Sequence, residues 1–305
     1  MATEHIVGGV WNDRDDLCPE FPSAQQMSRL IRRGFGLRKY RVPRLPKIAA
    51  RLLDISSSDD ASFEELARLI EQDVMIAGEV MRVVKSPTYN RGVEVTSIEQ
   101  AIARLGISTL RDIVAEAALE MCVFSSPDYF ALMDRLRVHG AATAHAARAI
   151  NEYLGVGYNF AFLGGLFHDV GIAAALLLLS AAYPDRSMDP SVLWAELNRI
   201  HEQTSWHVAN QWDLPKGILN AVRYHHSPQQ CPDKPQQPAV ICVAERLAQD
   251  AGAGFADLDV RGEDGCIPDH VDEESFIAAC DILKLSRADF AALRESTSAS
   301  IATIV

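Results

Sequence analysis

The spacing of apolar residues constrains the fold of this chain more than any other feature. Over most of its 305 residues, apolar side chains recur every three or four positions, as at Ile76, Val80 and Val84. This spacing places them on one face of a helix. No segment alternates apolar and polar residues between hairpin turns, as a sheet would require. The sequence therefore predicts an all-α protein, a multi-helix bundle with an N-terminal helical subdomain.

Capping and breaking residues predict where these helices begin and end. Ser62 and Glu65 have the spacing of a capping box, and Asp73 is placed to break the helix that they open. Gly106 can end a helix in the left-handed conformation, and Pro215 suits the first turn of one. The predicted helices are 63–84 with a break near residue 73, 98–105, 108–119, 132–154, 161–179, 192–212, 215–226, 240–251 and 276–293.

Composition and charge exclude several classes of protein. The net charge of −12 argues against bulk nucleic-acid binding, although a local basic patch is still allowed. We expect no membrane-spanning segment, because the longest apolar run, residues 172–179, is too short. The six cysteines are scattered and form no C-x-x-C pair, so neither a zinc knuckle nor a disulfide framework is indicated. We therefore expect a reduced, cytoplasmic protein.

One segment is basic in an otherwise acidic chain. Eight positive charges fall within the 19 residues from 29 to 47: Arg29, Arg32, Arg33, Arg38, Lys39, Arg41, Arg44 and Lys47. This segment could dock an anionic partner or nucleotide, or pack against a second copy of the acidic body in a homodimer. A solvated helix face followed by a basic linker explains the same charges. The sequence leaves these alternatives open.

Histidines carry the chemical information in this sequence. One of the nine, His168, precedes Asp169 within the segment GGLFHDVG at 164–171. Imidazole and carboxylate are good ligands for divalent iron, manganese or zinc. A carboxylate can also bridge two metals, and a bridging water then becomes a nucleophile at neutral pH. By itself, however, the doublet is equally explained by a buried histidine beside a capping aspartate.

The spacing of further histidines strengthens the metal hypothesis. His139 lies 29 residues before His168, on the preceding predicted helix, and His201 lies 32 residues after Asp169. The pair at 225–226 follows 24 residues after His201, and Glu245 follows 19 residues after that pair. Single residues from successive helices of an antiparallel bundle can meet at one point in its core.

Several motifs in a fixed order resemble the HDOD family. They are Leu45-Pro46, TSIEQAIARLG at 96–106, GLFHDVG at 165–171, WDLP at 212–215, YHH at 224–226 and AERLA at 244–248. This family is related to the HD and HD-GYP metal-dependent phosphohydrolases and is generally regarded as a signalling relative. The resemblance implies a bundle of HD-domain type. It also implies an HDOD domain over 41–250 with halves 41–125 and 126–250, an N-terminal extension over 1–40, and a linker and C-terminal helical tail over 251–305.

The resemblance implies a set of metal ligands, position by position. That set is His139, His168, Asp169, His201, His225, His226 and Glu245. His201 has a rival in His207, and only one of the adjacent pair 225–226 need bind metal, because neighbours on a helix point about 100° apart. Asp169 would be the catalytic residue if the protein is an enzyme. His145, His207 and His270 are expected to be ordinary surface or core residues, and His5 to be disordered.

Four departures from the family pattern bear on catalysis. Ile172 stands where HD hydrolases commonly have a lysine, and a cation there would stabilise charge on a phosphate. Glu245 replaces the usual aspartate and is one methylene longer. Lys85 stands where the family usually has asparagine, and no Gly-Tyr-Pro signature is present. These departures weaken the case for efficient phosphoryl chemistry.

Two functions from different classes follow. The first is a signal-transduction module of HDOD type that acts by binding a signalling protein partner or an anionic nucleotide, with a metal site retained. The second is a metal-dependent phosphohydrolase or nucleotide phosphodiesterase. The implied cofactor is one or two divalent ions, iron, manganese or magnesium. The motifs favour the regulatory function, since fold alone does not fix function.

Overall fold

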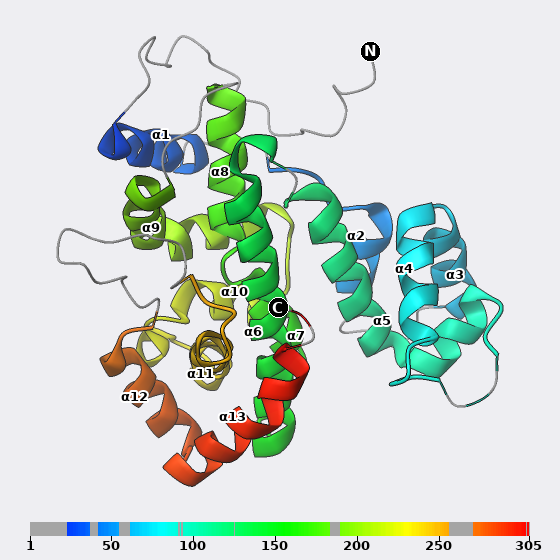
Figure 1. Cartoon of the computed structure of the whole chain (residues 1–305). Helices are drawn as coiled ribbons and strands as arrows, with labels where there is room; N and C mark the ends of the chain where they lie inside the picture. Colours follow the sequence, from blue (N-terminus) through cyan, green and yellow to red (C-terminus); the bar gives the residue numbers. More distant parts are fainter. Residues whose placement is uncertain are drawn as a thin grey trace. The chain divides into compact units, whose positions relative to one another are not determined.

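The computed structural model describes residues 23–36, 42–54, 62–90, 92, 94–124, 126–183, 190–255, 271–302 and 304. The predictions for His5, His270 and residues 37–41 of the basic segment concern positions outside these residues. The chain divides into two compact units, with unit 1 comprising Met1–Pro43 and Val123–Val305, and unit 2 comprising Arg44–Cys122. The described residues form helices and no strand, which confirms the all-α prediction (Figure 1). The domain boundaries at 40, 125 and 250 remain predictions.

The described residues of unit 2 form four helices around an aliphatic core. They are α2 (Lys47–Asp54), α3 (Phe63–Glu71), α4 (Val74–Val84) and α5 (Ile98–Cys122). Asp73 caps α4, where its carboxylate accepts hydrogen bonds from the backbone N–H groups of Met75 and Ile76. The predicted break near residue 73 is thus confirmed. Gly106 has a φ of 74°, so α5 is kinked where the sequence predicted one helix to end and another to begin.

The capping box predicted at Ser62 is not formed. Ser62 does precede α3, but its side chain makes no hydrogen bond to the helix backbone. Its hydroxyl donates instead to the carboxylate of Glu64, at 3.0 Å. The predicted helix start is correct and the predicted capping interaction is wrong, since the Ser62 side chain is turned toward Glu64.

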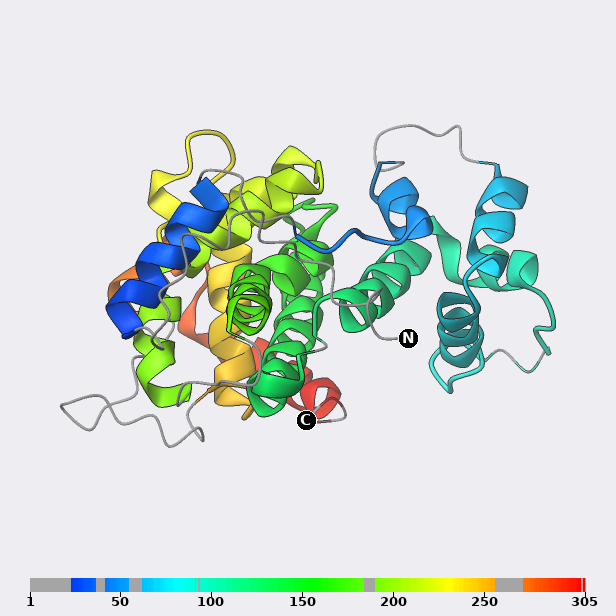
Figure 2. The ribbon, with the colours of Figure 1, turned by 90° about the horizontal axis from the view of Figure 1, so that it is seen from above.

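Unit 1 holds the remaining helices. These are α1 (Ala24–Gly36), α6 (Phe130–Leu154), α7 (Ala161–Phe167), α8 (Val170–Ala182), α9 (Pro190–Gln211), α10 (Lys216–Tyr224), α11 (Gln236–Asp250), α12 (Glu273–Leu283) and α13 (Arg287–Ile301), with short 3-10 turns η3 (Pro127–Tyr129) and η4 (Pro228–Gln230). Helix α1 lies against α9 (Figures 1 and 2). It does so through Met27, Ile31 and Phe35, which are almost completely buried.

The segment Ala161–Ala182 corrects one expectation from the sequence. By length and composition alone it is long and apolar enough to cross a membrane, whereas the sequence led us to expect no such segment. Its most apolar stretch is entirely buried inside unit 1, however, so it is explained as the core of the bundle. In the sequence, His168 and Asp169 interrupt this segment, so its longest uninterrupted apolar run is much shorter than the segment itself.

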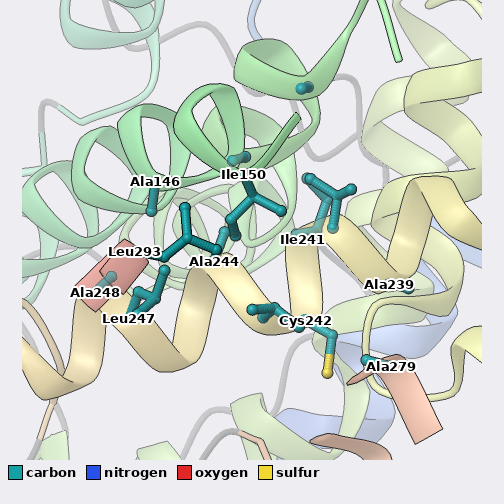
Figure 3. Close-up of a cluster of buried hydrophobic side chains, with 14 of the residues drawn as sticks. Ala146, Ile150, Ala239, Ile241, Cys242, Ala244, Leu247, Ala248, Ala279 and Leu293 are labelled. Carbon is teal, nitrogen blue, oxygen red and sulfur yellow. The ribbon is translucent and has the colours of Figure 1, made fainter. Parts of the chain in front are cut away.

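The two C-terminal helices pack onto the bundle. Ala244 and Leu247 of α11 lie beside Ile150 of α6 and Leu293 of α13 in one apolar cluster (Figure 3). At the surface, Arg246 of α11 forms an ion pair with the Glu273 carboxylate of α12, at 3.6 Å. Burial of this cluster places α11, which carries Glu245, in the centre of unit 1.

Candidate metal centre

All seven predicted ligands lie in the interior of unit 1. His139 comes from α6, His201 from α9 and Glu245 from α11, while the 168–169 doublet joins α7 to α8 and the 225–226 pair follows α10. Six of the seven are buried, and only the His226 side chain retains some exposure, at 13%. The structure therefore brings together residues that are up to 106 positions apart in the sequence.

The doublet sits in a break between two helices, which corrects the prediction of one continuous helix over 161–179. Helix α7 ends at Phe167 and α8 begins at Val170, and Asp169 has the non-helical angles φ −106° and ψ 10°. Two glycines permit the close packing on either side. A Cβ on Gly165 would lie 2.7 Å from Cα of Ala144 in α6, and one on Gly171 only 2.1 Å from the backbone nitrogen of Ser205 in α9. The close packing of Gly165 and Gly171 against neighbouring helices thus determines where the chain breaks between α7 and α8.

The first donor group consists of His139, His168 and Asp169. Their ligand atoms lie within 4.8 Å of one another, as a metal ion would require. The Nε2 atoms of His139 and His168 are 3.2 Å apart. The Asp169 carboxylate lies 3.4 Å from Nε2 of His168 and 3.8 Å from Nε2 of His139.

The second donor group consists of His201, His225 and His226. The Nε2 atoms of His201 and His225 are 3.1 Å apart. The other oxygen of Asp169 lies 3.6 Å from Nε2 of His201 and 3.9 Å from that of His225. Asp169 thus faces both groups, one oxygen to each, which is the arrangement of a bridging carboxylate.

Backbone carbonyls fix the tautomers of four histidines. Nδ1 of His139 donates to the carbonyl of Ala253 at 2.9 Å, and Nδ1 of His168 donates to that of Gly165 at 2.6 Å. His201 and His225 do the same with the carbonyls three residues before them. A carbonyl only accepts, so each Nδ1 carries the hydrogen, and in the neutral ring each Nε2 presents a lone pair. Carbonyl partners of this kind are typical of metal-binding histidines.

The facing lone pairs fit a cation. Two Nε2 lone pairs about 3 Å apart repel each other unless a proton or a metal ion lies between or beside them. A proton is disfavoured, because burial lowers the pKa of His139 to about 4, with His168 adding to the effect. Burial likewise lowers the pKa of His168 and of His225. The donor set present therefore fits a divalent metal in each group.

Glu245 is buried in α11, close to the second donor group. Its carboxylate lies 3.9 Å from Nε2 of His226. The pair lies beside the second group, since the His226 ring contacts the rings of His201 and His225.

Sequence reasoning missed residues that hold the centre in place. The Glu202 carboxylate accepts a hydrogen bond from the backbone N–H of His226 at 3.3 Å, and burial raises its pKa. The Ser275 hydroxyl donates to the carbonyl of the same histidine. Phe255 packs between His139 and Trp194, with ring centroids 5.0 and 4.3 Å away. Among these residues, only Glu202 could have been suspected from the sequence, because it follows directly after His201.

The other described histidines lie outside the two groups. His207, the rival of His201, stacks on Phe35 of α1. His145 contacts Phe162 edge-on, and burial lowers its pKa to about 4. Ile172 is buried in α8, so the position commonly held by lysine in HD hydrolases is part of the apolar core.

Fold and site define a helical bundle with a buried histidine and aspartate centre at the junction of two helices. The HDOD domain model matches residues 42–228, well over half of the chain. This chain therefore belongs to the HDOD family. The solved structures that it resembles include an HDOD domain protein of unknown function from Geobacter sulfurreducens, with a TM-score of 0.66 and 20% identity, covering 92% of this chain and 97% of that one.

Two further structures share the fold. A candidate metal-dependent phosphohydrolase from Shewanella amazonensis SB2B has a TM-score of 0.66 and 20% identity, covering 91% of this chain and 99% of that one. A candidate signal transduction protein from Marinobacter aquaeolei VT8 has a TM-score of 0.61 and 18% identity, covering 96% and 67%. An uncharacterized Treponema pallidum protein is 23% identical over 243 residues, 75% of this chain but only 44% of its own length.

Proposed function

We propose that this HDOD protein is a signal-transduction module that acts by binding a protein partner or an anionic nucleotide, and that unit 1 retains a metal centre. The observation that carries the proposal is the burial of the donor set. His139, His168 and His225 are completely buried, and the Asp169 side chain is 6% exposed. A catalytic metal keeps an open position for water or substrate, whereas a structural metal is closed off by protein.

The chemistry of the donors supports iron or manganese among the expected ions. Five of the six ligand atoms in the two groups are imidazole nitrogens, four of them on rings oriented by backbone carbonyls, whereas magnesium prefers oxygen ligands. One or two ions are compatible with the two groups. When bound, such an ion polarises ligands and lowers the pKa of a coordinated water. The protein residues contribute fixed Nε2 donors, a shared carboxylate and exclusion of solvent.

A phosphohydrolase is the second candidate, and one observation favours it. Asp169 faces both donor groups, as a carboxylate does in a two-metal hydrolytic site. Against it, the buried Ile172 offers no cation to a phosphate.

The solvent-exposed arginines of α1, Arg29 and Arg32, are part of the regulatory proposal as a contact for an anionic partner or a second copy of the chain.

Metal analysis with an activity assay separates the two functions. The full chain, purified without chelator, is assayed for iron and manganese and for hydrolysis of a generic phosphodiester and a cyclic dinucleotide. We expect bound metal and no hydrolysis. The His168→Ala variant should lose metal, while His145→Ala, a matched buried histidine outside both groups, should retain it. Turnover by the metal-loaded protein would overturn the regulatory proposal, and unchanged metal content in His168→Ala would overturn the site.

A further inference from the structure

His226 is held in the second donor group through its backbone, whereas carbonyls orient the other four histidines of the two groups at Nδ1. Its N–H donates to the Glu202 carboxylate at 3.3 Å, and its carbonyl accepts from the Ser275 hydroxyl at 2.5 Å. Glu202 belongs to α9 and Ser275 to α12. Side chains from two helices therefore hold the backbone of this histidine from both sides.

Ser275 is itself fixed in place, so the direction of its hydroxyl is determined by the fold. The residue is buried, its backbone N–H donates to the helix-capping carboxylate of Asp272 at 2.7 Å, and its carbonyl accepts from the Cys242 thiol of α11. The hydroxyl also lies 3.0 Å from the Asp272 carboxylate. Both oxygens near the hydroxyl are acceptors, and the shorter contact is the one to the His226 carbonyl.

Helix α12 lies outside the residues 42–228 that match the HDOD model. It packs on α11 and on η4, the turn that begins two residues after His226. The guanidinium of Arg246 in α11 lies over the ring of Phe276, 5.3 Å from its centroid, next to Ser275 in the chain. The docking of α12 on α11 thus brings the Ser275 hydroxyl to the metal centre.

The first donor group is held by other elements of unit 1. The carbonyl of Ala253 accepts from His139, and the carbonyl of Gly165 accepts from His168. Neither carbonyl belongs to α12, since Ala253 follows α11 and Gly165 lies in α7. A change in α12 therefore acts directly on the second group.

We propose that Ser275 is a positioning residue for the second donor group, and that the docking of α12 thereby determines whether His201, His225 and His226 hold an ion. The His226 ring contacts the rings of His201 and His225, with centroids 4.9 and 4.2 Å away, and the two backbone hydrogen bonds keep it there. Partners that orient metal ligands raise metal affinity. The proposal rests on the proposed metal centre and adds its regulation: a partner that favours a displaced α12 lowers metal affinity in one group only.

Calorimetric titration of the full chain with manganese, after removal of metal by chelator, tests this proposal. We expect the wild-type protein to bind two ions. Ser275→Ala should weaken one of them about 10–100-fold, the usual cost of losing a partner that orients a metal ligand, and leave the other unchanged. Ser275→Thr keeps the hydroxyl and should bind both ions. In His168→Ala, where only the second group is intact, Ser275→Ala should weaken the remaining ion by the same factor.

Variants of Glu202 test the other side of the same residue. Glu202→Ala removes the acceptor for the backbone N–H of His226 and should weaken the same ion as Ser275→Ala. Glu202→Gln retains an oxygen that accepts this hydrogen bond, so it should bind that ion more tightly than Glu202→Ala does. Equal effects of the two substitutions would show that the hydrogen bond to His226 does not position the group.

Ser126→Ala is the matched control, because it removes a buried serine hydroxyl of unit 1 that bonds to Ser180 at 2.8 Å. It should bind both ions as the wild type does. If Ser275 only stabilises the first turn of α12, Ser275→Ala will lower the Tm of the metal-free protein and bind both ions normally, which overturns the proposal.

Three further results decide against the proposal: equal weakening of both ions by Ser275→Ala, the same weakening by Ser126→Ala, or a wild-type protein that binds a single ion. The metal centre itself is judged by a different variant. If His168→Ala loses metal while Ser275→Ala binds as the wild type does, the proposed metal centre stands and only the role of α12 fails.

Discussion

His168, His201 and His225 share one local geometry, in which Nδ1 donates to the carbonyl three residues earlier in the chain. The helix backbone thereby orients each ring, and every Nε2 points into the same buried space. His139 reaches the same state through a distant carbonyl, that of Ala253. At the scale of single residues, the centre is thus preorganised by backbone groups, and its side chains carry no permanent positive charge to repel a metal.

His145 provides a test of electrostatics at this scale that is independent of metal. Its pKa is about 4 in the folded protein, because burial and then Arg148 disfavour the charged form, against about 6.5 in an unfolded chain. The unfolded state therefore takes up a proton first as the pH falls, and the stability present above pH 6.5 is lost on the way to pH 4. We expect His145 to account for about 2 kcal/mol of lost unfolding free energy between pH 7 and pH 4.5.

Comparison with His145→Leu isolates this contribution. The packing cost of the substitution does not depend on pH, so the difference in unfolding free energy between the two proteins should shrink by that amount on acidification, as measured in urea. A difference that stays constant from pH 7 to pH 4.5 would show that His145 titrates normally in the fold.

Close helix contacts position the site at the scale of elements. The break between α7 and α8 exists because α7 lies directly on α6 at Gly165 and α8 lies directly on α9 at Gly171. The backbone N–H of Gly171 also donates to the Ser205 hydroxyl, at 2.9 Å. These contacts hold Asp169 between the two histidine groups. Any side chain at Gly171 must therefore separate α8 from α9.

The variant Gly171→Ala tests the role of this packing. The added methyl group would meet backbone of α9 at 2.1 Å, which cannot be relieved by rotating a side chain. We expect a loss of about 3 kcal/mol or more in unfolding free energy and a lower metal content. Gly78→Ala is the control, because a Cβ on this exposed glycine of α4 meets nothing within 4 Å. It should gain about 0.5–1 kcal/mol. Similar effects of the two substitutions would contradict the packing argument.

Two compact units make up the whole molecule, and each has its own hydrophobic core. The candidate metal centre lies within unit 1. A ligand changes the conformational equilibrium only if it binds one state better than another. Because the donors of the centre come from five parts of unit 1, a bound metal stabilises the folded state of that unit.

Thermal unfolding with and without chelator tests this coupling. A metal present at 100 times its dissociation constant stabilises the folded state by about 2.7 kcal/mol, which corresponds to a rise of roughly 5–10 °C in Tm for a unit of this size. We expect chelation to lower the Tm of the wild-type protein by that amount and to leave that of His168→Ala unchanged. Equal shifts in both proteins would mean that the stabilising ion binds elsewhere.

Sequence reasoning reached the class of fold and the residues that gather in unit 1, because helical periodicity and residue spacing are local properties of a chain. It could not predict the break at residues 168–169, which depends on Gly171 meeting α9. Nor could it predict the role of Glu202 or of the Ala253 carbonyl, since each acts on a residue brought near by tertiary folding.

Anomalous diffraction at the iron and manganese edges from crystals of the full chain tests the central claim most directly. The account predicts a peak about 2.1 Å from the Nε2 atoms of His139 and His168, with Asp169 beside it, and allows a second peak at His201 and His225. Crystals grown from protein loaded with both metals but showing no peak in either group, with the histidine pairs in direct contact, would contradict it.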